Sequence, residues 1–89
     1  MIVANWKCNG SKTMIDAWFK TYIKDSEESN GVFIGIAPPT IYIERVADIA
    51  KKNSLQIKTG SQDIDISSGA RTGAISLEMI LDNNCYFSI

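Results

Sequence analysis

Residues 5–10 read Asn-Trp-Lys-Cys-Asn-Gly and lie where the first apolar stretch of the chain meets its first helix-forming stretch. Residues 2–6 are predicted to form a β-strand. Because side chains alternate along a strand, we expect Asn5 and Lys7 on one face and Trp6 on the other. A cation beside an amide at the end of a strand indicates a ligand-binding position rather than a packing position.

Beyond this stretch, helix-like and strand-like patterns alternate. Apolar residues at positions i, i+3, i+4 and i+7 predict one helix, and a similar pattern predicts a second. Ser11 or Thr13 can cap the first of these, since residues 13–16 fit a capping box. The two apolar faces consist of Ile15, Trp18, Phe19 and Tyr22, and of Ile43, Val46, Ala47 and Ala50.

Three further strands and a short helix complete the pattern. The strands are predicted at residues 32–37, 55–60 and 85–89, from short apolar runs bounded by turn residues. Ser76 is expected to cap a helix that runs through Asp82, after a polar loop at residues 63–73.

The alternation of strands and helices implies parallel strands joined by helical crossovers. Such strands form either an open doubly wound sheet or a closed barrel. A dinucleotide-binding sheet would carry a glycine-rich G-x-G-x-x-G turn after its first strand, and residues 5–10 lack it. We therefore predict an α/β fold, the N-terminal portion of a (β/α)8 barrel. Residues 1–89 are expected to form a single partial domain, with no second domain.

Composition excludes several classes of function. With a net charge of −1 and scattered Lys and Arg, the chain is expected to bind neither nucleic acid nor a membrane. Two cysteines, Cys8 and Cys85, are predicted to be reduced thiols of a cytoplasmic protein. The chain has no histidine, which excludes histidine acid–base catalysis within it. Residues 63–67 resemble a calcium loop but lack its glycine and its terminal acid, so no metal site is predicted.

Lys7 is the strongest candidate for a functional side chain. Parallel sheets of α/β proteins bind ligands at the carboxyl ends of their strands, and a fixed cation there can stabilise an oxyanion or attract a phosphate. The alternative is a solvated lysine at a strand end. Thr13, Ser61 and Cys8 have no neighbouring base in the sequence pattern, so nucleophilic catalysis has little support.

Four motifs, in order and correctly spaced across the chain, resemble the triosephosphate isomerase family, whose fold is a (β/α)8 barrel. They are residues 5–10 after the first strand, Ala37-Pro38-Pro39 after the second, Gln62 after the third, and residues 69–76 with the sequence Gly-Ala-Arg-Thr-Gly-Ala-Ile-Ser.

The resemblance implies a cofactor-free isomerase that interconverts dihydroxyacetone phosphate and D-glyceraldehyde 3-phosphate through an enediolate, in glycolysis and gluconeogenesis. Asn5 then corresponds to the amide that contacts the phosphorylated triose. Lys7 corresponds to the catalytic lysine that balances the charge of phosphate and enediolate, and Gln62 lies behind both.

The resemblance also implies a homodimer. Thr72 and Gly73 correspond to the tip of a loop, between Gly69 and Gly73, that enters the neighbouring subunit and packs around the position of Cys8. Two residues depart from the family pattern. Cys8 stands where many members have methionine, which makes the interface sensitive to thiol reagents, and Ala74 stands where glutamate is usual.

The family's Gly-His-Ser-Glu motif, which carries an electrophilic histidine, would follow Ile89, and its carboxylate base would come later still. We therefore expect the 89-residue segment alone to be inactive, either as a fragment or as a truncated gene product. One alternative is a non-catalytic, self-associating barrel fragment. Another is an unrelated phosphate-binding α/β module.

Overall fold

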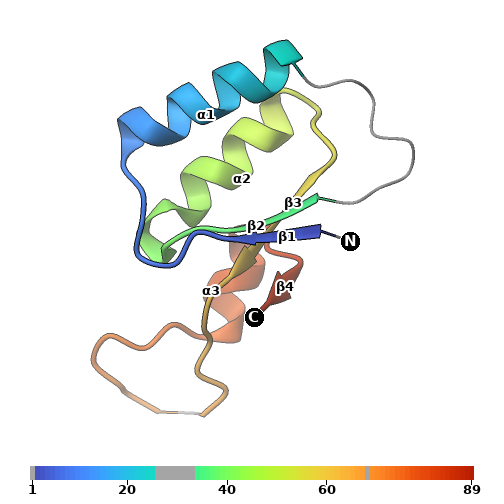
Figure 1. The fold of residues 1–89 in the computed structure, drawn as a ribbon. Coiled ribbons are helices and arrows are strands. Elements are labelled where there is room, and N and C mark those ends of the chain that lie inside the picture. The colour runs from blue at the N-terminus through green and yellow to red at the C-terminus, as the bar shows by residue number, and fades with distance from the viewer. Residues whose placement is uncertain (1, 26–33, 68) are drawn as a thin grey trace.

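A computed structural model describes residues 2–25, 34–67 and 69–89 of the chain. Strands and helices alternate along it (Figure 1). Their bounds are β1 (Ile2–Asn5), α1 (Lys12–Asp25), β2 (Ile34–Ala37), the 3-10 turn η1 (Thr40–Tyr42), α2 (Ile43–Lys52), β3 (Ile57–Ser61), α3 (Leu77–Asp82) and β4 (Phe87–Ser88).

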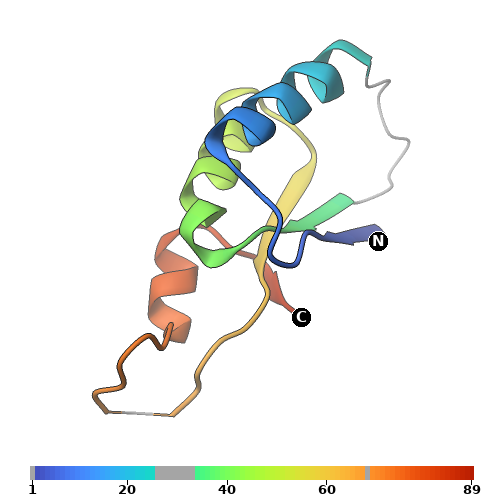
Figure 2. The same ribbon diagram turned by 60° about the vertical axis from the view of Figure 1, so that its left-hand side comes forward.

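The four strands form one parallel sheet in the order β1-β2-β3-β4. Asn5 is paired with Ala37, and Gly60 is paired with Phe87, so the carboxyl ends of the strands lie along one edge. Figure 2 shows the three helices along the same side of the sheet. This half-barrel confirms the prediction of the N-terminal part of a (β/α)8 barrel. Of the predicted second strand, residues 32 and 33 lie outside the described residues.

The sheet and the first two helices share one apolar core. Its buried members come from α1, β2, α2 and β3, and they are Ile15, Phe19, Ile36, Val46, Ala50 and Ile57. Both predicted helical faces are confirmed, with Trp18 and Tyr22 only partly buried at the margin of this core. Burial of one such aliphatic or aromatic side chain stabilises a fold by about 1.5–3 kcal/mol. The core therefore holds α1 and α2 against the middle of the sheet.

The helix caps differ from the prediction in one place. The Ser11 Oγ accepts a hydrogen bond from the Met14 N–H at 3.0 Å, and α1 begins at Lys12. The predicted capping box at Thr13 is wrong, because the Ser11 hydroxyl caps the Met14 N–H and Thr13 lies inside the helix. The cap of α3 is confirmed, since the Ser76 Oγ accepts from the Met79 N–H at 3.2 Å.

Two strands start later than predicted, because the preceding residues close a helix. After α2, Ser54 adopts a left-handed φ of 51°, and the Leu55 N–H donates to the Ala50 carbonyl at 2.9 Å. After α3, Asn84 has a φ of 59°, and the Cys85 N–H donates to the Ile80 carbonyl at 3.2 Å. A left-handed residue that returns the chain to the last helical carbonyls is a common helix ending. Hence β3 covers residues 57–61 and β4 only residues 87–88.

The face of the sheet away from the helices is filled by the ring of Phe87. A Cβ atom added to Gly35 would lie 2.9 Å from Phe87 Cε1, and one added to Gly60 would overlap the ring more deeply. Val3 Cγ2 lies 3.3 Å from the same position at Gly35, on the same face. Two glycines on neighbouring strands thus make room for one aromatic ring in the barrel interior.

Substitutions at two adjacent positions on β3 should change the free energy of unfolding in opposite directions. Gly60→Ala should lower the free energy of unfolding by about 1–3 kcal/mol, because the added methyl displaces the Phe87 ring. Ser61 is fully buried, and its hydroxyl has no hydrogen-bond partner among the described residues. Ser61→Ala should therefore raise the free energy of unfolding by about 1 kcal/mol. Urea titrations followed by circular dichroism measure both; a wild-type midpoint for Gly60→Ala would contradict the seating of Phe87.

Candidate functional site

The carboxyl ends of the first three strands are tied together by Gln62. Its Nε2 donates to the Lys7 carbonyl at 2.6 Å and to the Ala37 carbonyl at 3.0 Å. The Ala37 carbonyl also accepts from the Trp6 N–H at 3.0 Å. A single half-buried amide after β3 therefore fixes the chain after β1 and the last residue of β2.

Asn5 and Lys7 are adjacent, but a turn rather than a strand brings them together. β1 ends at Asn5, and residues 6–10 form what we call the Lys7 turn. The Asn5 Oδ1 accepts from the Lys7 N–H at 2.9 Å, and the Trp6 carbonyl accepts from the N–H and the Nδ2 of Asn9 at 3.0 and 3.1 Å. The expected strand alternation through Lys7 is wrong, because these local bonds end the strand two residues earlier.

Lys7 has a left-handed φ of 53°, which a non-glycine residue adopts rarely. Such a conformation costs about 1–3 kcal/mol and persists where surrounding contacts determine it. Asn5 lies two residues beyond Val3 and therefore on the same inner face of the sheet. The site thus consists of an amide at the inner edge of the half-barrel and a cation on a strained turn beside it.

The 63–75 loop projects beyond α3, away from the Lys7 turn in both Figure 1 and Figure 2. Thr72 and Gly73 are exposed at its turn, and Gly73 has a φ of 80°, which glycine tolerates. Cys8 is exposed on the Lys7 turn. The structure therefore groups Asn5, Lys7 and Gln62 and leaves the three expected interface residues on the surface.

Asp65 closes the base of this loop. Its N–H donates to the Ile75 carbonyl at 2.8 Å, and its carboxylate accepts from the Ser67 N–H at 2.9 Å and pairs with Arg71 at 3.3 Å. This ion pair was not predicted from the sequence, although opposite charges within a glycine-bounded loop could have indicated it. The contact of Gln62 with the Ala37 carbonyl was not predicted either, because a backbone acceptor leaves no sequence signal.

The described residues contain no group of three or more His, Cys, Asp or Glu side chains that could hold a metal ion. Within the same part of the chain, no helix has the length and apolar character that crossing a bilayer requires.

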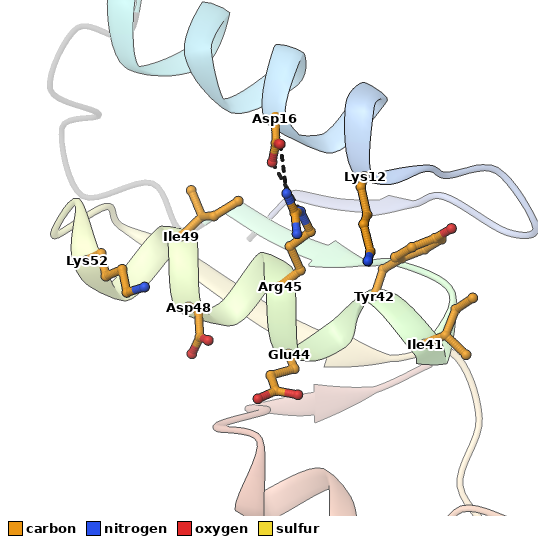
Figure 3. Close-up of a pocket in the computed structure, with 9 residues that line it drawn as sticks. All are labelled: Lys12, Asp16, Ile41, Tyr42, Glu44, Arg45, Asp48, Ile49 and Lys52. Carbon is orange, nitrogen blue, oxygen red and sulfur yellow. Dashed lines mark hydrogen bonds and ion pairs between the residues drawn. The ribbon is translucent and has the colours of Figure 1, made fainter.

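A groove of about 450 Å³ lies between α1 and α2, on the outer surface of the helices (Figure 3). Cations and carboxylates alternate along it, together with Ile41, Tyr42 and Ile49. The charged residues are Lys12, Asp16, Glu44, Arg45, Asp48 and Lys52. Because positive and negative charges are balanced, the groove offers a phosphorylated ligand no concentrated positive field. We therefore place the candidate site at the carboxyl edge of the sheet.

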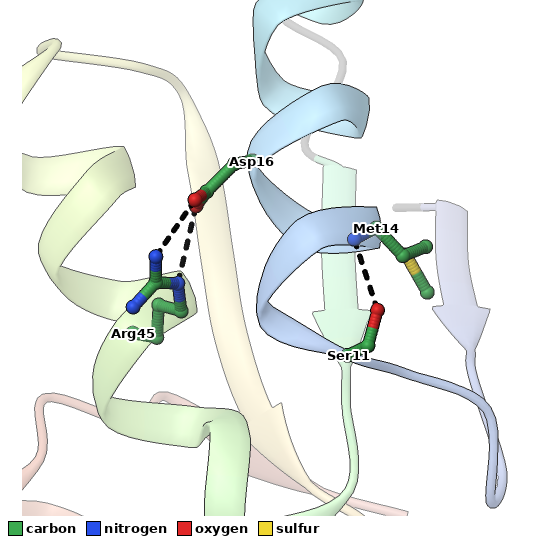
Figure 4. Close-up of polar contacts among 4 residues, drawn as sticks. All are labelled: Ser11, Met14, Asp16 and Arg45. Carbon is green, nitrogen blue, oxygen red and sulfur yellow. Dashed lines mark hydrogen bonds and ion pairs between the residues drawn. The ribbon is translucent and has the colours of Figure 1, made fainter.

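Asp16 and Arg45 join α1 to α2 across this groove (Figure 4). The guanidinium donates from Nε to Oδ1 at 3.1 Å and from a terminal nitrogen to Oδ2 at 2.7 Å. These hydrogen bonds lower the pKa of the Asp16 carboxyl below its ordinary value and raise the pKa of Arg45. Both side chains are partly exposed, so solvent weakens the pair, and its contribution to stability is modest.

The ion pair makes stability depend on pH. Because the pKa of Asp16 is lower in the folded chain, its stabilisation is present above the ordinary value of 3.8 and disappears as the pH falls through the folded value. Urea midpoints should therefore be lower for Arg45→Met than for wild type at pH 7, and the difference should be smaller at pH 2.5. Lys12→Met, which removes a nearby exposed cation, is the control. A difference for Arg45→Met that is as large at pH 2.5 as at pH 7 would show that packing, not charge, is lost.

Parallel strands, helices along one side and polar groups at the carboxyl edge define an α/β-barrel protein with its candidate site at the barrel mouth. A family profile described as triosephosphate isomerase matches residues 1–89. The chain belongs to the triosephosphate isomerase family.

Several relatives carry the name triosephosphate isomerase. The protein of Buchnera aphidicola subsp. Acyrthosiphon pisum is 45% identical over 85 residues, which is 91% of this chain and 32% of the relative. The protein of Psychromonas ingrahamii is 33% identical over 90 residues, covering 100% of this chain and 35% of the relative. The chain thus spans about a third of the length of the curated relatives it matches.

Proposed function

We propose that the complete protein to which this chain contributes interconverts dihydroxyacetone phosphate and D-glyceraldehyde 3-phosphate through an enediolate, without a cofactor. Family membership over residues 1–89 carries the proposal. A role in glycolysis and gluconeogenesis, in the cytoplasm, follows from the same reaction.

The residues at the carboxyl edge suit this chemistry. An enediolate and a phosphate are both anionic, and the Lys7 ammonium supplies the opposite charge from a turn that is already folded. The Asn5 Oδ1 accepts a hydrogen bond from the Lys7 N–H, so the amide NH2 of Asn5 remains to donate to a substrate oxygen. Gln62 does not need to touch substrate, since it acts through the Lys7 carbonyl.

The isomerisation also needs a group that moves a proton between adjacent carbons, and a lone lysine cannot do so. The chain has no histidine. This chain matches about a third of each relative. In our proposal the proton-transfer groups lie in the part of the relatives that this chain does not match. The segment supplies charge and orientation to a site completed by those groups.

A hybrid enzyme tests the proposal. Residues 1–89 replace the matching third of the Buchnera aphidicola relative, and turnover of glyceraldehyde 3-phosphate is measured. We expect an active hybrid in which Lys7→Ala lowers kcat/KM by at least ~10²-fold, because a preorganised charge on the enediolate is lost. Lys12→Ala, at the start of α1 and on the outer groove, is the matched control and should stay within about twofold. Near-wild-type kinetics for Lys7→Ala would contradict the proposed role.

The proposed homodimer places the 69–73 loop of one subunit against Cys8 of the other. Support comes from the closed base of the loop at Asp65 and from exposed apolar residues near it. Ile66, on the loop, is 86% exposed. Ile41, which lines a groove together with Ile75 and Met79, is 82% exposed. Large apolar side chains exposed to this degree around one projecting loop are typical of an interface.

Alkylation of the hybrid measures this interface. Cys8, which is exposed in one chain, should be protected from iodoacetamide in the dimer. Thr72→Asp should restore its labelling and give a monomer in sedimentation, since a buried charge weakens the contact. Burial raises the pKa of Cys85, so that thiol should stay unlabelled in both forms and serves as the internal control. Equal labelling of Cys8 in hybrid and Thr72→Asp would contradict the dimer.

A second candidate function is a non-catalytic, self-associating barrel fragment. In the described sheet, apolar side chains are exposed at both edges: Ile2 and Val3 on β1, and Tyr86 and Ile89 at β4. Edge strands also present unpaired backbone groups to other chains. This favours association of the isolated segment with a copy of itself.

Purified as 89 residues, the chain should therefore show no isomerase turnover and should sediment as a species larger than 9.8 kDa at low micromolar concentration. Turnover that is abolished by Lys7→Ala would contradict the first expectation, and turnover insensitive to it would reveal a contaminating enzyme. A sharp 9.8 kDa boundary with cooperative unfolding would contradict the second.

A further inference from the structure

The Lys7 turn combines a strained residue with anchors that are mostly exposed. The hydrogen bonds from Lys7 to Asn5, from Asn9 to Trp6 and from Gln62 to the Lys7 carbonyl all lie in solvent-exposed surroundings. Water competes for exposed hydrogen bonds, so these bonds alone constrain the turn weakly. A left-handed lysine that persists there indicates a further constraint.

Aromatic rings supply this constraint at the first residue of the turn. The Trp6 ring meets the edge of Trp18 at a centroid distance of 5.7 Å and an interplanar angle of 68°. Trp18 is itself held on α1, because it contacts Phe19 edge-on at 5.0 Å and stacks on Tyr22 at 5.1 Å. Phe19 is a buried member of the core. Trp18 thus connects the rigid core to the residue immediately before Lys7.

A second ring constrains the last residue of the turn. A Cβ atom added to Gly10 would lie 3.2 Å from Tyr42 Cδ2 and 3.3 Å from Tyr42 Cε2, so the Tyr42 ring lies directly against the glycine. Tyr42 also packs against the core. An aromatic ring from outside the turn therefore packs against each end of it, Trp18 of α1 at Trp6 and Tyr42 of η1 at Gly10. We call these two contacts the aromatic grip.

We propose that Trp18 and Tyr42 are positioning residues that hold Lys7 in its left-handed conformation and so fix its ammonium at the barrel mouth. The expected effect on turnover rests on the proposed isomerase function. The expected effect on the conformation of the Lys7 turn does not. Trp18 acts through Trp6, and Tyr42 acts through Gly10. Displacement of a catalytic group by about 1 Å can lower a rate ~10²-fold, so a loosened turn should reduce turnover without preventing folding.

The test compares Trp18→Leu with Tyr22→Leu in the hybrid enzyme. Both substitutions remove a ring from the same stack on α1, but only the first removes the contact with Trp6. Amide exchange by NMR should show the Asn9 N–H, which donates to the Trp6 carbonyl, exchanging at least ~10-fold faster in Trp18→Leu. Amides of β2 should exchange equally in the two variants. In Trp18→Leu the turnover number should fall about tenfold, with KM within twofold of wild type. Trp18→Phe should restore most of the turnover and most of the protection of the Asn9 N–H.

The outcomes separate the two proposals. Faster Asn9 exchange in Trp18→Leu, in a hybrid that never shows turnover, would support the aromatic grip and overturn the proposed function. Equal Asn9 exchange in Trp18→Leu and Tyr22→Leu would overturn the grip even in an active enzyme. If Trp18→Leu does not fold, Tyr42→Leu decides at the other end of the turn: unchanged Asn9 exchange there overturns the inference, and a ~10-fold increase supports it.

Discussion

The packing of Ile36 and Ile57 against the first two helices is the constraint on which the rest of this structure depends. These residues lie on neighbouring parallel strands and share one core with Phe19 of α1 and Val46 of α2. A parallel strand cannot follow its neighbour through a tight turn, so each pair needs a crossover, and here the helices cover one face. With the helices on one side, the strands keep one direction, and their carboxyl ends meet at one edge.

Chemistry at that edge depends on backbone geometry as much as on side chains. Gln62 donates hydrogen bonds to the carbonyls of Lys7 and Ala37, and so links the carboxyl ends of β1, β2 and β3. Lys7 then occupies a conformation that the chain would rarely adopt alone. In our proposal, a lysine whose backbone is fixed in this way needs less ordering when an anionic ligand binds, which is the physical basis of electrostatic preorganisation. The outer groove at Asp16 and Arg45, by contrast, is a contact between helices in which the charges cancel.

Sequence periodicity determined most of the architecture by itself. The apolar positions of both long helices recur every three to four residues, and Ile15 and Val46 are buried as that pattern requires. The alternation of elements predicts parallel strands, and the turn at residues 5–10 favours a barrel because it lacks a phosphate-binding glycine pattern. Ser76 was predictable as a cap because its hydroxyl acts within one turn of helix. Local signals of this kind succeed because their cause and their effect lie close together in the chain.

Only the tertiary structure decided the backbone conformation of Lys7 and which groups contact its backbone. The strand alternation predicted through Lys7 is wrong, because β1 ends at Asn5. The Lys7 carbonyl, which Gln62 contacts from 55 residues away, belongs to a turn. The seating of Phe87 over two glycines and the ring of Trp18 against Trp6 also join segments distant in sequence. The sequence alone determined the order and type of the helices and strands and which motifs mark the family, but not where β1 ends or where β3 and β4 begin. Contacts between distant segments decided the geometry of the site, because their free energy depends on distances that no local pattern contains.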